Sequence, residues 1–341
     1  MKRATSLFNQ IVSYENVRLA WLKARKGKSS KPVVRNFYKN VNSNLEKVQK
    51  TLKANPPVLS SYTQFTIFDP KERVISVVPF VDRVMHHAIM NVLEPVFERQ
   101  FIFHTYACRK EKGSHKAVNY AFKKARNYKY FLKLDVRKYF DNIDHTVLKK
   151  LLSKIIKDVE CLNLLFSLID SYGMVVSTGS TTASSGSTTA SSDSTTASRK
   201  GLPIGNLTSQ FFANYYLSLL DHYVLEQLKP CGYVRYMDDF LLFDDSKEKL
   251  KIFLTQIENF CKNELILELK PPVLGNCKNG ASFLGYLIKS DSVKLTQKSR
   301  RRKLAKLKRL NYELKMGWID EEEYITRVCC MYAVSKVNFS N

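Results

Sequence analysis

The fold of this chain depends on one stretch, Gly232-Tyr233-Val234-Arg235-Tyr236-Met237-Asp238-Asp239-Phe240-Leu241-Leu242-Phe243. An apolar, aromatic run leads into two adjacent carboxylates and a second apolar run follows, which predicts a β-hairpin with Asp238 and Asp239 at its tip. Aspartate is a poor strand residue and neighbouring carboxylates repel each other. A hard divalent cation such as Mg²⁺ would offset that repulsion. The alternative is an ordinary Asp-Asp turn, and the stretch alone leaves both interpretations open.

A third carboxylate, upstream in the sequence, favours the metal site. Tyr130 to Val136 is a short apolar strand in which Asp135 stands near the end. A sheet can bring this strand beside the hairpin, so that three carboxylates converge. A two-metal nucleotidyl-transfer site needs this arrangement, because one ion lowers the pKa of the attacking hydroxyl and the other neutralises charge on the leaving pyrophosphate.

Length and composition indicate a folded protein without a membrane span. The chain has 341 residues, 44% of them hydrophobic, which suffices for a large core and two or three subdomains. It contains no apolar run long enough to span a bilayer, and residues 1–10 lack the apolar core of a signal peptide. We expect a soluble intracellular protein. The seven cysteines are scattered without a CxxC pair, so free thiols are expected rather than disulfides or a zinc site.

The charge balance points to a polyanionic partner. Lys and Arg number 55 against 31 Asp and Glu, a formal net charge of +24, and nucleic acid is the simplest partner for such a protein. A ribosome-associated or membrane-surface protein could share this composition. The 12% aromatic content argues against a disordered basic tail.

The N-terminal part reads as a basic helical extension. A first helix should bury a loose apolar stripe, and a second should run from Val34 to Lys53. The charges of both could be a solvated face or a nucleic-acid contact. The stripe consists of Leu7, Ile11, Val17, Leu19 and Leu22.

A hairpin and three helices are expected next. Residues 62–78 alternate as two strands around a turn at Asp69-Pro70, and a helix begins near Asp82. His86 and His87 are adjacent on that helix, so they should face different sides and serve packing rather than a shared metal. Further helices are predicted over 117–126, after a basic loop, and over 145–157.

Residues 177–198 differ in composition from the rest of the chain. The unit Ser180-Thr181-Thr182-Ala183-Ser184-Ser185-Gly186 is repeated with small changes and has no apolar stripe. Such a composition predicts a disordered, dispensable loop. It could be a natural expansion or an inserted segment.

The segment Gly201 to Gln210 precedes a helix predicted to extend to Leu228. Its glycines and proline could let the backbone approach a ligand closely, or it could be only a loop with an N-cap at Thr208 or Ser209.

The C-terminal third should hold a helix, two short β segments and a basic helix. The helix is expected over 246–261, a strand over 265–269 and a small hairpin around 283–288. Residues 294–315 carry ten cations, so one face of this helix could follow a phosphate backbone. Its apolar stripe is Leu304, Leu307 and Leu310.

Taken in this order, the motifs resemble those of the reverse transcriptases over roughly residues 60 to 290. Phe131 to Val136 looks like polymerase motif A, Gly201 to Gln210 like motif B, Tyr236 to Asp239 like the YxDD box, and Phe283 to Tyr286 like the primer grip. The segments over 73–88 and 106–116 resemble those of the fingers.

Motif B is unusual within that family. Most members carry Gln-Gly and Ser-Pro where this chain has Ile204-Gly205 and Ser209-Gln210. This pattern, the compact length and the string from Pro79 to His87 resemble the reverse transcriptases of diversity-generating retroelements, which act in mutagenic retrohoming. We see no endonuclease or maturase domain, which counts against a full group II intron protein, and no Val-Thr-Gly after Tyr286, which counts against retrons.

The resemblance implies roles for individual residues. Asp135, Asp238 and Asp239 would be catalytic, and with the Val136 carbonyl they would hold two Mg²⁺ ions, for which Mn²⁺ could substitute. Phe140 would be the aromatic gate that excludes a ribose 2′-OH. The general acid stays unassigned, with Lys270 a candidate. The other nucleotide contacts would be Arg73, Arg109, Ile204, Gly205 and Gln210, the primer grip Phe283, Leu284, Gly285 and Tyr286, and the nucleic-acid contacts Arg300, Arg301, Arg302 and Lys303.

The implied fold is α+β, a right-hand polymerase. It would comprise a helical extension (1–57), fingers (58–130), a palm with an antiparallel sheet (131–290) and a helical thumb (291–341). Implied partners are an RNA template, a primer or cDNA strand, dNTPs and a basic oligomeric accessory variability protein. The setting would be the cytoplasm, with the protein encoded by a prokaryote or a phage.

Three other interpretations remain. The chain could be another group II-like or defence-associated reverse transcriptase, against which motif B weighs. It could be a catalytically dead RNA-binding protein, which the intact carboxylates disfavour. It could be an RNA-dependent RNA polymerase, against which Phe140 argues.

Overall fold

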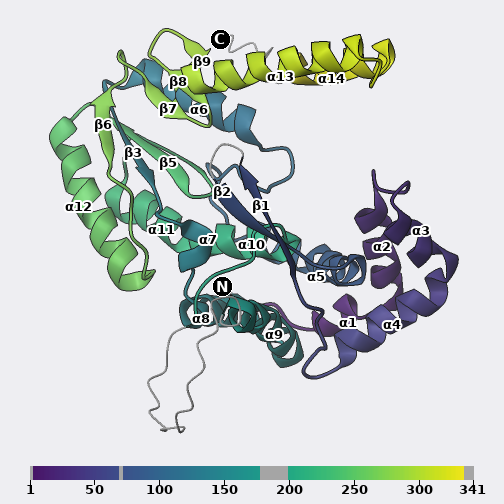
Figure 1. The fold of residues 1–341 in the computed structure, drawn as a ribbon. Coiled ribbons are helices and arrows are strands. Elements are labelled where there is room, and N and C mark those ends of the chain that lie inside the picture. Colours follow the sequence, from purple (N-terminus) through teal and green to yellow (C-terminus); the bar gives the residue numbers. More distant parts are fainter. Residues whose placement is uncertain (1–2, 69–71, 177–198, 334–341) are drawn as a thin grey trace, which may run out of the picture. The chain divides into compact units, whose positions relative to one another are not determined.

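The computed structural model describes residues 3–68, 72–176 and 199–333 (Figure 1). The predicted disordered loop over 177–198 and the turn at Asp69-Pro70 lie outside the described residues. The chain divides into two compact units. The first comprises Met1–Phe101, Arg137–Leu219 and Phe260–Glu268, and the second Ile102–Val136, Leu220–Asn259 and Leu269–Asn341.

The first unit is built around one long helix, α5 (Phe80–Glu98), which packs against α1, α2, α4 and α10. Of the predicted apolar stripe, Leu7, Ile11 and Val17 are buried, but Leu19 and Leu22 are 45% and 37% exposed. The prediction is wrong for these two because α2 turns another face, containing Ala20, Trp21 and Ala24, toward the core. The N-terminal helices are α1 (Phe8–Ile11), α2 (Tyr14–Arg25), α3 (Pro32–Lys39) and α4 (Val41–Lys53).

Two predicted helices are interrupted. The helix expected over 34–53 is α3 and α4, separated at Asn40, whose φ of −125° and ψ of 49° are not helical. The helix expected over 210–228 is α10 (Leu207–Tyr216), α11 (Ser218–Tyr223) and the π-helical η1 (Val224–Leu228). A single apolar pattern continues through both breaks, so sequence periodicity could not reveal them.

In the rest of the first unit, the hairpin and the helix predicted over 145–157 are confirmed, whereas the helices α7 and α9 were not predicted. Strands β1 (Thr63–Phe68) and β2 (Glu72–Val77) pair antiparallel, which confirms the expected hairpin. The helices are α7 (Tyr139–Asn142), α8 (His145–Ile155) and α9 (Val159–Val176).

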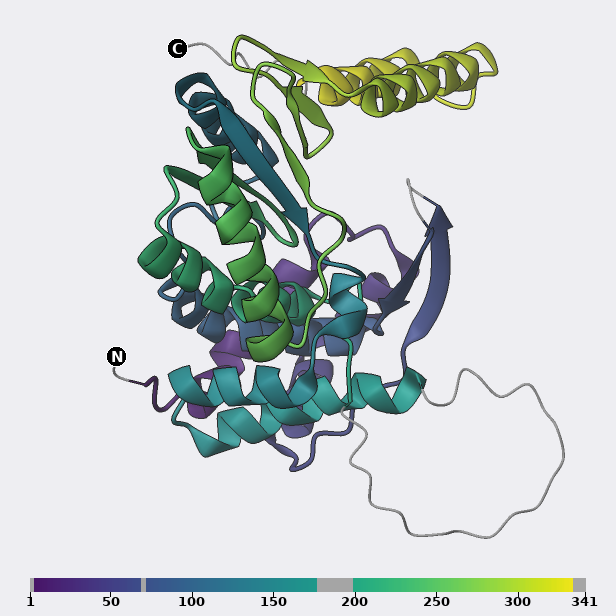
Figure 2. The same ribbon diagram turned by 90° about the vertical axis from the view of Figure 1, so that its left-hand side faces the viewer.

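The second unit contains a four-stranded antiparallel sheet in the order β4-β5-β3-β6. Helix α6 (Ser114–Asn127) packs against β4 and β5, and α12 (Lys247–Glu264) runs alongside the sheet (Figure 2). A buried apolar core of α6 and the strands fixes the sheet. The strands are β3 (Tyr130–Asp135), β4 (Gly232–Tyr236), β5 (Asp239–Asp244) and β6 (Val273–Asn276).

The strand predicted over 265–269 is wrong. Ile266 has a left-handed φ of 52°, and within this segment only Leu269 bridges to Val136. The fourth strand is β6, which begins after Pro271-Pro272. Proline has no N–H to donate to a ladder, so regular pairing starts only beyond it.

A small sheet and two helices complete the second unit. Strands β7 (Ala281–Phe283), β8 (Tyr286–Ile288) and β9 (Val293–Leu295) form the sheet, and α13 (Gln297–Lys315) packs against β9 and α14 (Glu321–Ala333). The stripe predicted for α13 is wrong at Leu304, which is 50% exposed, whereas Leu310 is buried. Among the described helices, none is long and apolar enough to cross a membrane.

Candidate active site

The two adjacent aspartates lie at the tip of the β4–β5 hairpin, as the sequence predicts. Tyr236 and Asp239 are the last paired residues, so Met237 and Asp238 form a two-residue loop. Met237 has a φ of 56°, the left-handed conformation that a tight hairpin loop requires. The loop places Asp238 in the turn and Asp239 at the first position of β5.

Strand β3 brings Asp135 to the same place. Asp135 and Asp239 are direct partners in the β3–β5 ladder. The amide of the next residue, Val136, donates to the Asp238 carbonyl over 3.3 Å. The sheet therefore brings together all three carboxylates that the sequence singles out.

Two of the three carboxylates, Asp135 and Asp239, each lie beside a lysine. Lys270 Nζ donates to Asp135 Oδ1, and its backbone amide donates to the Asp135 carbonyl over 2.8 Å. Lys133 Nζ lies 3.4 Å from Asp239 Oδ1 and also donates to the Ser282 carbonyl over 2.6 Å. Sequence reasoning missed Lys133, although strand alternation could have found it, because residues two apart on a strand share a face.

Burial dominates the electrostatics of Asp239. It raises the pKa of Asp239 to about 7, Lys133 opposes the rise, and the charges of Asp135 and Asp238 add to it. A buried carboxylate near its pKa at neutral pH is stabilised in its charged form by any further cation.

The donor set suits a hard divalent ion. Carboxylate oxygens from adjoining strands are the ligands that Mg²⁺ takes. Within the described residues, no group of three or more His, Cys, Asp and Glu side chains is already arranged around one metal position.

A buried ion pair supports the loop. Arg235 is fully buried, and its Nε and Nη2 donate to the two Asp221 oxygens over 2.6 and 2.5 Å. Its Nη1 donates to the Met237 carbonyl over 2.9 Å. The hydroxyls of Tyr233 and Thr105 also donate to Asp221, over 2.7 and 3.0 Å. Sequence reasoning missed this cluster, which an arginine inside an apolar strand should have signalled, because a buried arginine is almost always paired.

In the first unit, the motif B segment lies against β2. The Ile204 carbonyl accepts from the Ser76 amide over 2.9 Å. Gly205 has a φ of 126°, and a Cβ there would lie 2.9 Å from the Ser76 carbonyl oxygen, so only glycine fits. The N-cap of α10 is Asn206, which corrects our expectation of Thr208 or Ser209.

The other predicted nucleotide contacts are dispersed over both units. Arg73 is exposed on β2 and Gln210 is exposed on α10. Phe140 is half-buried in α7, edge-on to Tyr139 at 5.8 Å between ring centroids. Arg109, in the second unit, donates through Nη1 to the Ile102 and Thr105 carbonyls over 2.5 and 2.8 Å, so its guanidinium shapes the local turn. Their roles toward a nucleotide stay predictions.

The primer-grip motif is a tight loop between β7 and β8. Leu284 and Gly285, with φ of 49° and 84°, join the paired residues Phe283 and Tyr286. The Gly285 carbonyl accepts from the Thr296 amide over 3.0 Å, which ties the loop to the start of α13.

The basic helix α13 presents most of its cations to solvent. Arg300, Arg301 and Arg302 are exposed, and Lys303 is half-buried. Arg300 and Lys303 line a cavity of about 450 Å³ with an apolar floor.

Residues 68–288 match the protein family described as reverse transcriptase (RNA-dependent DNA polymerase). The chain belongs to the reverse transcriptase family. The matched range contains motif A, motif B, the YxDD box and the primer-grip loop. It begins at the last residue of β1 and ends at the last residue of β8.

The relatives of this reverse transcriptase include intron-encoded proteins. The group II intron-encoded protein LtrA of Lactococcus lactis subsp. cremoris is 23% identical over 301 residues, covering 69% of this chain and 48% of LtrA. The putative COX1/OXI3 intron 2 protein of Saccharomyces cerevisiae is 22% identical over 309 residues, covering 74% of this chain and 33% of that protein. The chain thus spans about half or less of the length of these relatives.

Solved structures confirm the fold class. Apo telomerase from Candida tropicalis, truncated from its C-terminal domain, superposes with a TM-score of 0.51 at 15% identity, covering 70% of this chain and 56% of that one. Telomerase from the same yeast in complex with a fragment of telomeric RNA has a TM-score of 0.50 at 14% identity, covering 77% and 49%. The chain has the α+β right-hand polymerase fold predicted from its motifs.

Proposed function

We propose that this reverse transcriptase synthesises cDNA from dNTPs on an RNA template, with Asp135, Asp238 and Asp239 as its catalytic carboxylates. The observation that carries the proposal is the ladder pairing of Asp135 with Asp239 beside the loop that holds Asp238. In this proposal residues 1–57 are an extension, 58–130 the fingers, 131–290 the palm and 291–341 the thumb.

The same carboxylates and the Val136 carbonyl would hold two Mg²⁺ ions, with Mn²⁺ as a substitute. When bound, such ions lower the pKa of an attacking hydroxyl and neutralise charge on a pyrophosphate. Lys133 lowers the pKa of Asp239 and so favours the ionised form, which is the form that binds a cation. Lys270 holds the Asp135 side chain beside the hairpin.

Primer extension tests the assignment of the carboxylates. Asp238→Asn and Asp239→Asn should abolish extension on a defined RNA template with dNTPs, while RNA binding stays close to wild type. Asp291→Asn, on an exposed turn of the same unit, is the matched control. Extension by either site variant at the control rate would show that the site is wrong.

The proposal includes selection of deoxynucleotides by Phe140 and triphosphate contacts from Arg73 and Arg109. The primer would contact the loop from Phe283 to Tyr286, and the nucleic-acid backbone would contact Arg300 to Lys303. A preference for rNTPs by the wild-type protein would instead favour an RNA-dependent RNA polymerase.

We further propose that the enzyme belongs to a diversity-generating retroelement of a prokaryote or its phage and copies template adenines with errors. Ile204, followed by Gly205, Ser209 and Gln210, carries this proposal. An isoleucine in place of a polar contact removes a hydrogen bond, which weakens geometric selection by about 1–3 kcal/mol. The proposed partner is a basic, helical, oligomeric accessory variability protein.

Sequencing of the cDNA tests the subclass. Wild-type product should carry substitutions concentrated opposite template adenines, and Ile204→Gln should reduce them by roughly one to two decades. If product forms only after the accessory protein or native RNA is added, that dependence would itself support the subclass.

A second candidate is a faithful group II-like reverse transcriptase. The similarity to LtrA and to the yeast intron 2 protein favours it. Faithful cDNA from wild type, with no adenine bias in the presence of the accessory protein, would assign the chain to this second class.

A further inference from the structure

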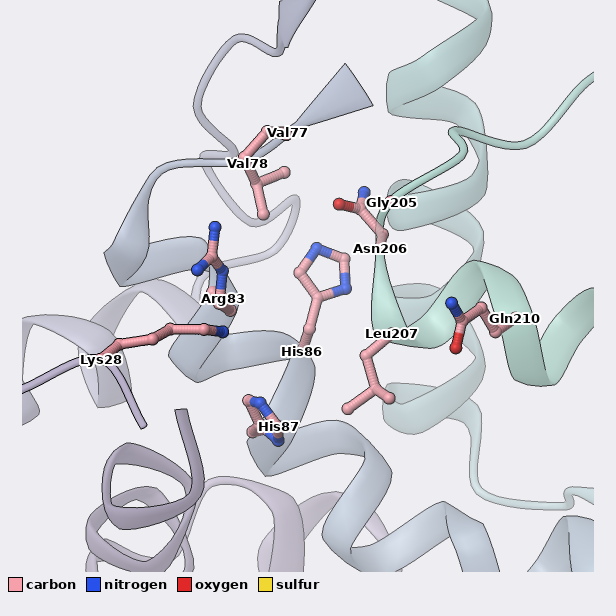
Figure 3. Close-up of a pocket in the computed structure, with 10 residues that line it drawn as sticks. All are labelled: Lys28, Val77, Val78, Arg83, His86, His87, Gly205, Asn206, Leu207 and Gln210. Atoms are coloured by element: carbon pink, nitrogen blue, oxygen red, sulfur yellow. The ribbon is translucent and has the colours of Figure 1, made fainter. Parts of the chain in front are cut away.

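The two ends of the motif B segment have different surroundings within the first unit. Gly205 and Asn206 line a cavity of about 330 Å³ beside α5 (Figure 3). Residues 199–202 instead lie against α7 and the start of α8. This second contact joins the motif B segment to the short helix that carries Phe140, the proposed gate against a 2′-OH.

Backbone hydrogen bonds form this contact. The Leu202 amide donates to the Phe140 carbonyl over 2.8 Å, and the Gly201 amide donates to the Ile143 carbonyl over 2.9 Å. Helix α7 has only four residues, and a helix this short is not stable by itself. The position of Phe140 is therefore set by tertiary contacts, of which the hydrogen bond from Leu202 is one.

One side chain, the imidazole of His145, reinforces the contact. His145 is the first residue of α8 and is 2% exposed, and its Nε2 donates to the Gly201 carbonyl over 2.7 Å. A carbonyl oxygen only accepts hydrogen bonds, so Nε2 carries the proton. The His145 backbone amide also donates to the Arg199 carbonyl over 3.0 Å. Gly201 is thus held on both sides, through its amide and through its carbonyl oxygen.

Asp170 and Lys149 lie on the other side of the ring. The Asp170 carboxylate is 3.7 Å from His145 Nδ1, and Lys149 Nζ donates to both of its oxygens over 2.7 Å. Nδ1 is buried and makes no hydrogen bond within the part of the chain that the structure describes. Burial lowers the pKa of His145, while the bond to Gly201 and the charge of Asp170 oppose that change. Because Lys149 already compensates Asp170, the neutral ring with its proton on Nε2 is favoured.

We propose that His145 is a positioning residue for the gate: it holds Phe140 in place through residues 201–202 and so helps the enzyme to discriminate between deoxynucleotides and ribonucleotides. The inference rests on the proposed function, in which Phe140 excludes a 2′-OH. A steric gate acts by contact with one oxygen atom, and a displacement of about 1 Å can change a rate by about a hundredfold. His145 is buried, so it acts on the sugar through Phe140 and not by contact.

Single-nucleotide incorporation on an RNA template measures the effect. His145→Leu removes the donor, whereas His145→Gln keeps an amide donor that can reach the Gly201 carbonyl. The ratio of kcat/KM for a dNTP to that for the matching rNTP should fall by about tenfold or more in His145→Leu and stay within about threefold of wild type in His145→Gln. His222→Leu, at a histidine whose side chain is 45% exposed, is the control and should keep the wild-type ratio. An equal loss of kcat/KM for both substrates in His145→Leu would show a purely structural role and overturn the proposal.

A double-mutant cycle tests whether the effect passes through Phe140. Phe140→Ala should lower the same ratio by itself, and adding His145→Leu should lower it no further, because residues that act as a unit are not additive. Additive losses would show that His145 acts elsewhere, which would also overturn the proposal. If His145→Leu is too unstable to assay, His145→Asn takes its place, because its shorter amide does not reach Gly201.

Hydrogen exchange supplies a readout that needs no synthesis. In His145→Leu the amides over 199–202 should exchange about tenfold faster than in wild type, whereas those of β1 and β2 should not change. Unchanged exchange over 199–202 would contradict the positioning role. A wild-type protein that does not extend a primer would sink the proposed function, and the exchange measurement would still decide whether His145 holds the segment that contacts Phe140.

Discussion

Individual residues in this protein are constrained more by backbone geometry and burial than by the charge they carry. Gly205 occupies a left-handed conformation against the Ser76 carbonyl, where no side chain fits. His86 is buried, and its Nδ1 lies 2.8 Å from Thr208 Oγ1. Both residues hold the start of α10 against the hairpin and α5, so substitutions there should act first on stability.

We expect Gly205→Ala to destabilise the protein by about 2 kcal/mol or more, because the new Cβ meets a backbone atom in a strained conformation. Gly27→Ala is the matched control. Gly27 also has a positive φ, of 69°, but its Cβ would have nothing within 4 Å. Urea unfolding of both variants measures the difference. An equal loss of unfolding free energy in the two variants would show that the positive φ, and not the contact with Ser76, causes the destabilisation.

His86 should make stability fall in acid. Burial lowers the pKa of His86 to about 4, and the charges of His87 and Arg83 assist. Between the unfolded value near 6.5 and the folded value, the unfolded chain binds more protons. The contribution of neutral His86 to the free energy of unfolding is therefore fully present above pH 6.5. It is lost as pH falls toward 4, by an amount on the order of 3 kcal/mol.

His86→Gln removes this titration and keeps an amide that can hydrogen-bond to Thr208. The difference in unfolding free energy between pH 7 and pH 4.5 should therefore be smaller in the variant than in wild type. Equal acid sensitivity of the two proteins would show that other groups cause the decline.

At the scale of elements, the β4–β5 hairpin depends on a side-chain support as well as on its ladder. Arg235 connects the loop carbonyl of Met237 with the carboxylate of Asp221 on α11. Because α11 and η1 lead directly into β4, the helix and the strand are fixed to each other at the loop. The position of Asp238 and Asp239 thus depends on a buried ion pair.

Arg235→Met alone should cost about 3–5 kcal/mol, because it leaves Asp221 charged and buried without its cation. The double variant Arg235→Met, Asp221→Asn removes both charges and keeps an oxygen that accepts from Tyr233, so most stability should return. Extension activity should stay at least tenfold below wild type in the double variant, because the bond to Met237 is still missing.

Thermal melts and primer extension, measured on the same preparations, separate the two effects. Wild-type activity in the refolded double variant would show that Arg235 serves stability alone.

At the scale of the whole molecule, the positive net charge and the reverse transcriptase family both fit the proposed nucleic-acid partner. A net charge of +24 is distributed over both units, and the sheet with the three carboxylates lies within the second. The first unit holds the motif B segment, Phe140 and a cavity lined by Lys28, Arg83 and Asn206 among others. The second unit therefore holds the proposed catalytic carboxylates, the primer-grip loop and the basic helix α13, and the first holds proposed nucleotide contacts.

The charge predicts strongly salt-dependent RNA binding. For single strands, log K should fall against log salt concentration with a slope of about −0.7 for each phosphate contacted. We expect at least a tenfold loss of affinity between 50 and 200 mM salt, measured by fluorescence anisotropy, if four or more phosphates are contacted. A slope near zero would contradict a phosphate-based interface and remove nucleic acid as the reason for the charge.

Sequence patterns predicted the local elements well where periodicity is unambiguous. The β1–β2 and β4–β5 hairpins, α6 and the β7–β8 hairpin all occur where expected. Predictions were wrong where tertiary packing overrode a continuous pattern, as at Asn40 between α3 and α4, at Leu304 on α13, and over 265–269. A periodic apolar pattern shows that some face is buried, but not which residue interrupts the helix or faces solvent.

The sequence by itself determined the family, the order of its motifs and the presence of paired carboxylates on a hairpin, because these depend on neighbours along the chain. Only the tertiary structure decided that Asp135 pairs with Asp239, that Lys133 and Lys270 neutralise them, and that Arg235 is held by Asp221. It also decided that Lys28, Arg83 and Asn206 surround one cavity. These contacts join segments distant in sequence, and the register and burial that create them arise only when the sheet and the helices pack.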